Sequence, residues 1–288
     1  MERVVSVDEV RAALARLRRD GRTVGFVPTM GALHDGHLSL VRASRRHADV
    51  TVVSIFVNPT QFGPGEDFEA YPRDLDSDTA LLADEGVDIL LTPTVDAMYP
   101  PGADTHVDPG RIGTVLCGAA RPGHFTGVAT VVTKLFQIVT PDIAFFGEKD
   151  YQQLKILEKV ARDLDMRVRV AGCPIVREPD GLAMSSRNRY LSPDQRSHAT
   201  VLYRALATAH DAACAGETDA GVLTRGVRET IDREEGVELE YAVVVDAETL
   251  DPVSVVQRPA RALVAARVGS ARLIDNVAIP LPGTGPSR

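Results

Sequence analysis

The sequence predicts an α/β protein with a doubly wound parallel sheet, followed by a smaller α+β unit. Over the first 175 residues, short apolar segments rich in β-branched residues alternate with amphipathic helical segments. This alternation is typical of a Rossmann-like parallel sheet covered by helices on both faces. Beyond residue 175 helices come first and strands follow, which indicates a separate unit. A length of 288 residues also favours two domains. We predict domains at 1–175 and 176–282, and a disordered tail at 283–288.

The first domain begins with a helix over residues 8–19, where Val10, Ala13, Leu14 and Leu17 share one face. The strand that follows, 24–27, is expected to end at Pro28, because proline cannot donate to a sheet ladder. Later strands are predicted at 50–57, 87–92, 142–146 and 166–170, and later helices at 74–85, 126–139 and 151–164. Residues 93–125 hold many prolines and glycines and are predicted as loop with one or two short elements.

The second domain shows helical patterns at 193–214 and 218–233. Strands are predicted at 238–245, 261–268 and 271–277. Helices followed by strands indicate a smaller α+β unit.

Composition and charge exclude several classes of protein. The net charge is −8, aromatic residues make up 5% and tryptophan is absent, so a nucleic-acid partner is not expected. The cysteines, Cys117, Cys173 and Cys214, are odd in number and form no C-x-x-C pair, which favours a reduced, cytoplasmic location. The N-terminus lacks the apolar core of a secretory signal, and no apolar run reaches about 18 residues, so no membrane span is predicted.

The stretch from Val24 to His37 reads VGFVPTMGALHDGH and predicts a strand, a turn containing Gly31 and Gly36, and a helix. His34 and His37 fall where the turn becomes the helix. A helix N-terminus favours phosphate, and imidazoles there add hydrogen-bond donors. Two other interpretations exist: a histidine at a helix start is commonly a cap, and H-x-x-H is also a metal-ligand spacing. Asp35 is a poor third ligand and no other Cys or His lies nearby in the sequence, which weighs against a metal site.

Three loops with unusual polar residues follow predicted strands: PTMGALHDGH, NPTQFGPGEDF and GEKD. Ligands of open parallel sheets bind beyond the carboxyl ends of the strands. We therefore expect these three loops to lie along one edge of the sheet.

A last segment with chemical character, Glu178 to Tyr190, reads EPDGLAMSSRNRY. A turn at Pro179 to Gly181 precedes two serines and Arg187, groups that can surround the outer phosphates of a nucleotide. The alternative is a solvated hinge loop.

These segments resemble known signatures. HDGH is similar to the first signature of the HIGH superfamily of adenylate-forming nucleotidyltransferases, and AMSSR resembles its mobile KMSKS loop, with the first lysine absent and Arg187 in the last basic place. PTMGALHDGH, FVNPTQF, RPGHFTGV, FFGEKDYQQL and DGLAMSSRNRYLS together resemble the pantothenate synthetases, the pantoate–β-alanine ligases, in family order from about residue 3 to 281.

The resemblance implies the family's reaction in pantothenate and coenzyme A biosynthesis. Pantoate attacks the α-phosphate of ATP to give pantoyl adenylate and pyrophosphate, and β-alanine then displaces AMP to form pantothenate. It also implies Mg²⁺, a homodimer and a cytoplasmic location. The first domain would bind nucleotide and pantoate, and the second would act as a lid.

The resemblance implies roles residue by residue. His37, His34 and Lys149 would be catalytic, Gln61 and Gln153 would bind pantoate, and Gln61 would also bind β-alanine. Arg121 and His124 would lie near the mouth of the site. Asp76 and Asp78 are candidate neighbours of Mg²⁺, which we expect mainly on the ATP phosphates, with no protein ligand named. The ATP-binding residues would be Met30, Gly31, Ala32, Leu33, His34, Asp35, Gly36, His37, Gly147, Glu148, Lys149, Asp150, Val176, Met184, Ser185, Ser186 and Arg187.

Two alternative functions are set against this interpretation. Another HxGH nucleotidyltransferase would not explain the FVNPTQF and GEKDYQQ segments. A non-catalytic nucleotide-binding or RNA-binding module is opposed by the acidic net charge and by the basic set of His34, His37, Lys149 and Arg187. No pattern of a covalent nucleophile is present, so catalysis is expected to depend on positioning and charge neutralisation.

Overall fold

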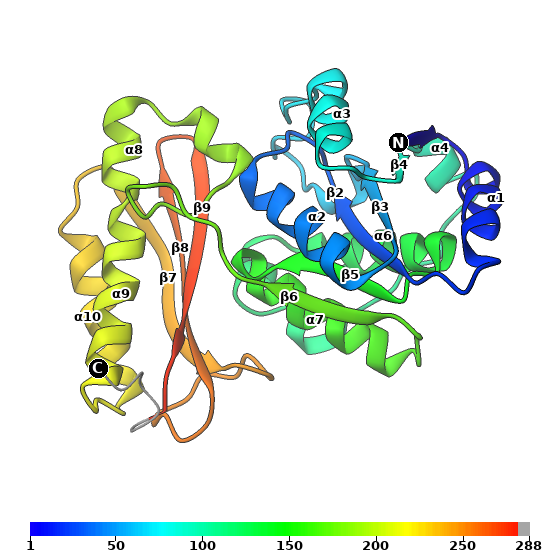
Figure 1. Cartoon of the computed structure of the whole chain (residues 1–288). Helices are drawn as coiled ribbons and strands as arrows, with labels where there is room; N and C mark the ends of the chain where they lie inside the picture. Colours follow the sequence, from blue (N-terminus) through cyan, green and yellow to red (C-terminus); the bar gives the residue numbers. More distant parts are fainter. Residues whose placement is uncertain (282–288) are drawn as a thin grey trace. The chain divides into compact units, whose positions relative to one another are not determined.

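A six-stranded parallel sheet organises the N-terminal part of the chain (Figure 1). The strand order is β1-β4-β3-β2-β5-β6. The strands are β1 (Glu2–Val4), β2 (Val24–Thr29), β3 (Val50–Ile55), β4 (Ile89–Leu91), β5 (Ile143–Gly147) and β6 (Arg169–Cys173). The strand order changes direction between β2 and β5, which marks the point where ligands bind in doubly wound sheets.

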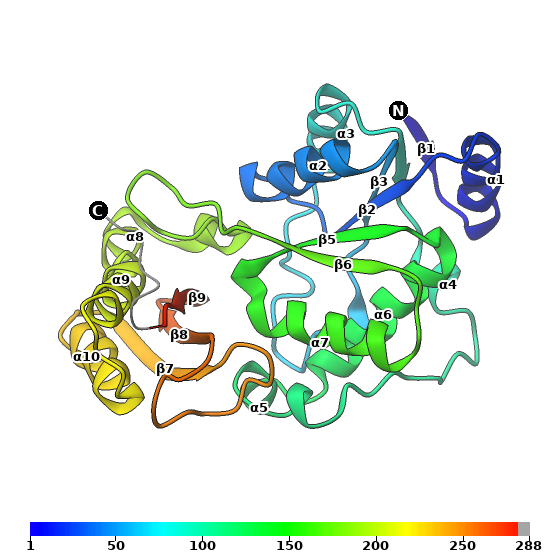
Figure 2. The ribbon, with the colours of Figure 1, turned by 60° about the horizontal axis from the view of Figure 1, so that its bottom comes forward.

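Helices cover both faces of this sheet (Figure 2). Helices α2 and α3 lie on one face, and α6 and α7 lie on the other. Shorter helices fill the loops that follow β3 and β4. The helices are α1 (Val7–Arg18), α2 (Asp35–His47), α3 (Leu75–Asp84), α4 (Val95–Met98), α5 (Cys117–Ala120), α6 (His124–Val139) and α7 (Tyr151–Asp163), with 3₁₀ turns η1 (Pro59–Gln61), η2 (Gly110–Gly113) and η3 (Glu148–Asp150).

The computed structural model describes residues 1–281. The chain divides into two units, the first made of 1–148 and 152–174 and the second of Lys149–Tyr151 with the chain from Ile175 onward. The three residues Lys149–Tyr151 therefore group with the second unit, whereas the sequence predicts a single boundary at 175. The disordered tail predicted at 283–288 lies outside the described residues.

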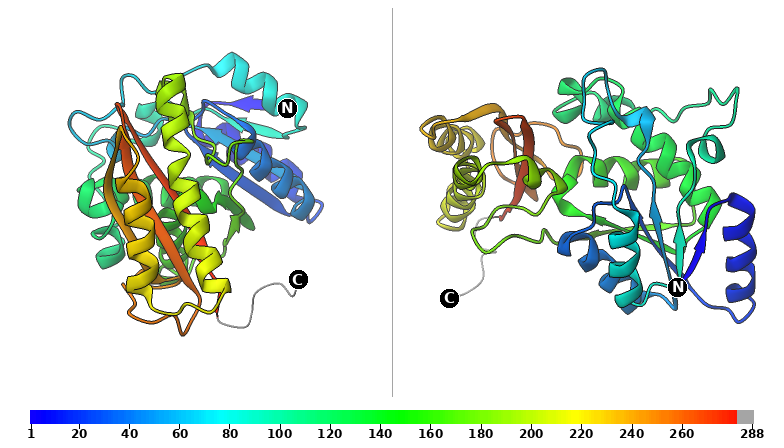
Figure 3. Two further views of the ribbon diagram at one scale, coloured as in Figure 1. Left: turned by 90° about the vertical axis from the view of Figure 1, so that its left-hand side faces the viewer. Right: turned by 90° about the horizontal axis from the view of Figure 1, so that it is seen from above.

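The second unit is a three-stranded antiparallel sheet with two long helices packed along one face (Figure 3). Its helical core residues, Leu202, Leu206, Leu223 and Ile231, are all buried against the sheet. The predicted α/β sheet with a smaller α+β unit is thus confirmed. The elements are η4 (Ser186–Tyr190), α8 (Pro193–Ala199), α9 (Val201–Cys214), α10 (Ala220–Asp232), β7 (Val237–Asp246), β8 (Ala260–Val268) and β9 (Ala271–Ile279).

The prediction that β2 ends at Pro28 is wrong, because the strand continues to Thr29. The carbonyl of Thr29 accepts from Phe56, on the side of β3. Neighbouring residues of a strand direct their polar groups to opposite sides, so Pro28 faces the β5 side. Pairing with β5 has already stopped at Phe26, so the missing N–H of Pro28 costs no ladder bond.

Other boundaries also differ from prediction. The strand predicted at 166–170 begins at Arg169, because its partner β5 begins at Ile143, which pairs with Arg169. The helix predicted at 193–214 is two helices separated at Thr200, whose hydroxyl donates to the carbonyl of Ser197. Strand β1 was not predicted, since three residues are too few to show a pattern.

Two further observations concern the cysteines and membrane-spanning helices. The cysteines Cys117, Cys173 and Cys214 are all free. Across residues 1–281, we find no helix that combines the length and the apolar character needed to span a membrane.

Candidate active site

The turn between β2 and α2 is held by a carboxylate from another helix. Gly31 and Ala32 both have left-handed backbone, with φ of 82° and 51°. This conformation costs alanine about 1 kcal/mol or more. Asp78 of α3, which is buried, accepts from the amide of Ala32 at 2.9 Å and from that of Leu33 at 2.8 Å. Asp78 therefore fixes the turn, and Gly31 leaves room for it, because a Cβ there would lie 2.9 Å from a carboxylate oxygen.

The two histidines lie where α2 begins, as predicted. His34 is the N-cap, and its Nδ1 accepts from the amide of Gly36 at 3.2 Å. Since Nδ1 accepts, the neutral ring carries its proton on Nε2. His37 lies in the first turn, with its ring centroid 4.2 Å from that of His34. The helix N-terminus thus combines its own dipole with two imidazoles.

Gln61 follows β3 and has a fixed amide. Its Nε2 donates to the sulfur of Met30 at 3.1 Å, and its Oε1 accepts from Nδ2 of Asn58 at 3.1 Å. Asn58 is only 1% exposed and also accepts from the hydroxyl of Tyr99 at 2.9 Å. In the sequence Asn58 stood out only as part of the FVNPTQF segment, and its contact with Gln61 was not predicted.

The backbone of Gln61 is anchored by a polar cluster made of Glu66, Arg121 and His124. Nη1 of Arg121 donates to Nε2 of His124 at 2.9 Å, so the neutral ring carries its proton on Nδ1, which donates to the Gln61 carbonyl at 2.7 Å. Arg121 also pairs with Glu66, with Nε 2.6 Å from Oε1, and this hydrogen bond lowers the pKa of Glu66 to about 2. Glycine at 127 permits the close approach of α6, since a Cβ there would lie 2.3 Å from the carbonyl oxygen of Thr60.

The two glutamines at the start of α7 differ in their environment. The side chain of Gln152 is buried and spans the preceding loop, where it accepts from the amide of Cys117 and donates to the carbonyls of Ile112 and Val115. It is a structural residue. Gln153, the predicted pantoate ligand, is half-buried beside it.

Other predicted site residues lie in the second unit. Nζ of Lys149 is 3.8 Å from the carboxylate of the exposed Asp150. Val176 and Met184 are paired through backbone, with the Met184 amide donating to the Val176 carbonyl at 3.0 Å. Ser185 caps the 3₁₀ turn that contains Ser186 and Arg187.

The structure thus brings together part of the predicted set. In the first unit, the turn after β2, the loop after β3 and Gly147 with Glu148 at the end of β5 follow three neighbouring strands of the sheet, as expected. The candidate magnesium neighbours separate: Asp76 is exposed, whereas the carboxylate of Asp78 is used by the turn amides. Within residues 1–281, no group of three or more His, Cys, Asp or Glu could hold a metal ion.

Comparison with known proteins decides the family. Residues 2–278 match the model of the pantoate-beta-alanine ligases. The chain belongs to the pantoate–β-alanine ligase family. A pantothenate synthetase of Rubrobacter xylanophilus is 54% identical over 94% of this chain and 96% of the relative. One of Thermotoga petrophila is 51% identical over 96% of this chain and 99% of the relative.

Solved structures agree with this membership. The crystal structure of a pantothenate synthetase from Thermus thermophilus is 49% identical, with a TM-score of 0.92 over 98% of this chain and 100% of that one. A pantoate-beta-alanine ligase from Francisella tularensis, complexed with beta-gamma ATP and beta-alanine, is 35% identical, with a TM-score of 0.80 over 100% of both chains. The resemblance carried by the five sequence segments is confirmed, and the chain is an enzyme of the ligase class.

The first prediction concerns Asp78. Asp78→Ala leaves two turn amides without their acceptor, and we expect the free energy of unfolding to fall by about 2–4 kcal/mol. Urea denaturation measures it. The control is Asp76→Ala in the same helical turn, which is exposed and is expected to cost less than about 1 kcal/mol. Equal losses in the two variants would show that the turn does not depend on Asp78.

The second prediction concerns pH. Arg121 lowers the pKa of Glu66 from 4.5 to about 2, so the stability that Glu66 contributes is complete above pH 4.5 and is lost as the pH falls toward 2. Glu66→Gln is expected to reduce the free energy of unfolding at pH 7 by about 1–2 kcal/mol, and the deficit is expected to shrink at about pH 3.5. The exposed Glu69→Gln serves as the control. A deficit that is the same at both pH values contradicts the assignment.

Proposed function

We propose that this chain joins pantoate to β-alanine at the expense of ATP, with release of AMP and pyrophosphate through a pantoyl-adenylate intermediate. The observation that supports it is full-length membership of the ligase family, with the paired histidines in place at the start of α2. The Francisella relative was solved with beta-gamma ATP and beta-alanine, and both correspond to substrates that the sequence resemblance implies.

In the first step an oxygen of the pantoate carboxylate bonds to the α-phosphorus of ATP, and the bond to pyrophosphate breaks. We assign the binding of the phosphates to the N-terminus of α2 with His34 and His37, and to Lys149. Such donors stabilise charge that develops in the transition state without reorganising. His34 suits this role because it caps α2, which places its ring at the positive end of the helix dipole.

In the second step the amine of β-alanine attacks the acyl carbonyl, and AMP leaves with the bridging oxygen. Gln61 is assigned to pantoate and β-alanine and Gln153 to pantoate. The fixed amide of Gln61 supports this, since an oriented amide positions a substrate without first losing rotamer freedom.

The remaining ATP contacts are assigned residue by residue. Asp150 would bind the ribose hydroxyls, Val176 would complete the nucleotide site, and Met184–Arg187 would act as a loop that orders over the phosphates. The backbone from Met30 to Gly36, with Gly147 and Glu148, would complete the set. Arg121 and His124 would act near the mouth of the site.

Magnesium, quaternary structure and location are proposals from the family resemblance. Residues 1–281 offer no acidic cluster suited to a protein-only Mg²⁺ site. We therefore propose that Mg²⁺ arrives as part of the ATP substrate, on its phosphates. A homodimer and a cytoplasmic location complete the proposal.

The third prediction tests the reaction. Pantoate carrying ¹⁸O in its carboxylate is expected to give labelled AMP and unlabelled pyrophosphate, because the acyl–O–P oxygen comes from pantoate and stays on phosphorus. Pyrophosphate is also expected to exchange into ATP when pantoate is present and β-alanine is absent. Release of ADP with labelled phosphate would indicate an acyl phosphate and would overturn the mechanism. A nucleotidyltransferase of another kind would form no amide, and a non-catalytic module would turn over nothing.

The fourth prediction tests the phosphate donors. Lys149→Ala and His37→Ala are each expected to slow pantoate-dependent pyrophosphate exchange on the order of 10²-fold or more, as for the loss of one preorganised donor. Gln152→Glu is not a suitable control, because that side chain supports a loop. Lys159→Ala is suitable, since its partner is Asp163, one turn later in α7. Near-normal exchange in Lys149→Ala or His37→Ala would remove the assigned role.

A further inference from the structure

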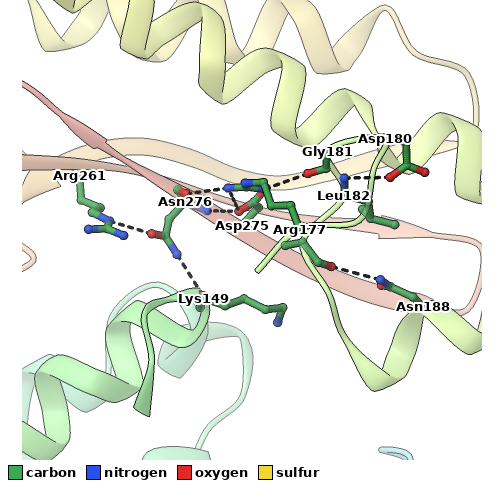
Figure 4. Close-up of polar contacts among 10 residues, drawn as sticks. Lys149, Arg177, Asp180, Gly181, Leu182, Asn188, Arg261, Asp275 and Asn276 are labelled. Carbon is green, nitrogen blue, oxygen red and sulfur yellow. Dashed lines mark hydrogen bonds and ion pairs between the residues drawn. The ribbon is translucent and has the colours of Figure 1, made fainter. Parts of the chain in front are cut away.

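Strand β9 carries two neighbouring buried polar residues, Asp275 and Asn276, and apart from Arg272 its other residues are apolar. Asp275 and Asn276 are 4% and 2% exposed. A charge or amide this deeply buried is costly unless it is bonded to partners. Figure 4 shows that the partners of these two residues lead to two separate segments of the second unit.

Asn276 holds the segment that carries Lys149. Its Nδ2 donates to the backbone carbonyl of Lys149 at 3.0 Å, and its Oδ1 accepts from Nε of Arg261 at 2.7 Å. The guanidinium of Arg261 also lies over the ring of Tyr151, 4.2 Å from its centroid, and the Tyr151 hydroxyl donates to the carbonyl of Ala247. These bonds explain why Lys149–Tyr151 groups with the second unit.

Asp275 holds the segment that leads to the AMSSR loop. Its two oxygens accept from the two terminal nitrogens of Arg177 at 2.6 and 2.9 Å. Arg177 also donates to the carbonyl of Gly181 at 3.1 Å and stacks on Tyr203, 4.2 Å from the ring centroid. Position 181 must be glycine, because φ is 92° and a Cβ would lie 2.3 Å from Tyr203.

The Arg177 anchor continues directly into the loop. Arg177 and Ala183 form an isolated antiparallel bridge, and the amides of Glu178 and Met184 donate to the carbonyls of Leu182 and Val176. The hairpin 176–184 therefore connects Arg177 to the Met184–Arg187 loop, which begins at the last residue of the hairpin. Asp275 also accepts from the amide of Asn276 at 2.7 Å, which joins the two anchors.

We propose that Asp275 and Asn276 are positioning residues for adenylation, which act through Lys149 and through the Met184–Arg187 loop. This inference rests on the proposed function, which assigns both segments to ATP. Two neighbouring positions on one strand fix two chain segments relative to each other, and a displacement of about 1 Å in such a segment is enough to slow a reaction severely. Neither residue is assigned a contact with substrate.

The test for Asn276 is a double-mutant cycle. Asn276→Asp keeps the shape and the acceptor for Arg261 but places an oxygen against the Lys149 carbonyl. We expect the kcat of pantoate-dependent pyrophosphate exchange to fall about 10-fold to 10²-fold. In the Lys149→Ala background the same substitution is expected to change kcat less than about 2-fold, because its effect passes through Lys149.

The matched control is Arg272→Gln, also on β9. It removes the ion pair between Arg272 and Glu240 of β7 and leaves both anchors intact. It is expected to keep the wild-type exchange rate. If Asn276→Asp does not fold, Arg261→Gln removes the donor to Asn276, and we expect the same dependence on Lys149. Effects that multiply in the Lys149→Ala background would show a general structural role and would overturn the proposal.

The test for Asp275 is hydrogen exchange in the Asp275→Asn variant, which weakens the ion pair with Arg177. We expect the amides of Glu178 and Met184 to exchange at least 10-fold faster, and those of β7 to be unchanged. In Asn276→Asp these hairpin amides are expected to keep their protection. Uniformly faster exchange throughout the second unit in Asp275→Asn would contradict the proposal.

These outcomes distinguish the role proposed for Lys149 from the role proposed for Asn276. A wild-type rate in Lys149→Ala would remove the role proposed for Lys149 itself. A slow Lys149→Ala with a fully active Asn276→Asp would leave that role in place and overturn only the positioning role.

Discussion

The contact between the Asp78 carboxylate and the turn after β2 fixes the backbone that leads into α2. The turn requires left-handed backbone at Gly31 and Ala32. It directs the amides of Ala32 and Leu33 toward the buried carboxylate of Asp78. Without an acceptor, these buried and unpaired amides would lower the free energy of unfolding. With the acceptor, the chain reaches His34 in position to cap α2. A residue of α3 thus sets where the helix N-terminus lies, although we assign it no contact with ATP.

In the second unit and in the loop after β3, a polar side chain likewise holds the backbone in place. Asn276 binds the backbone of Lys149, and His124 binds the backbone of Gln61. In each case a buried or half-buried polar side chain is bonded to main chain, and it fixes the backbone of a residue that we assign to a ligand. Such networks are rigid when fully satisfied, because in a low dielectric each lost partner is costly. Rigid backbone then allows a few side chains to act on a substrate without further ordering.

The sequence predicted the elements with strong periodicity and the loops that follow them, but not the contacts between distant segments. The strand-turn-helix around HDGH and the three strands of the second unit are local patterns, and they were predicted correctly. Pro28 was misjudged because its effect depends on where the partner strand β5 stops pairing, which no local pattern reports. Asp78 was named only as a candidate magnesium neighbour. Its acceptor role depends on a turn 45 or 46 positions earlier in the chain.

The distribution of ion pairs bears on how an acidic chain can hold a polyphosphate. Two of its half-buried arginines are neutralised within the fold, since Arg121 is paired with Glu66 and Arg177 with Asp275. The low pKa of Glu66, caused by the hydrogen bond from Arg121, means that this pair stays ionised and closed at neutral pH. A closed pair acts as a cross-link and adds little field at a distance.

Lys149 is different, because its acidic neighbour lies 3.8 Å away and is itself exposed. Water screens such a pair, so a phosphate can displace the partner at small cost. The positive end of α2 in the first unit and Lys149 in the second are therefore each suited to an anion, although the chain as a whole carries a net charge of −8.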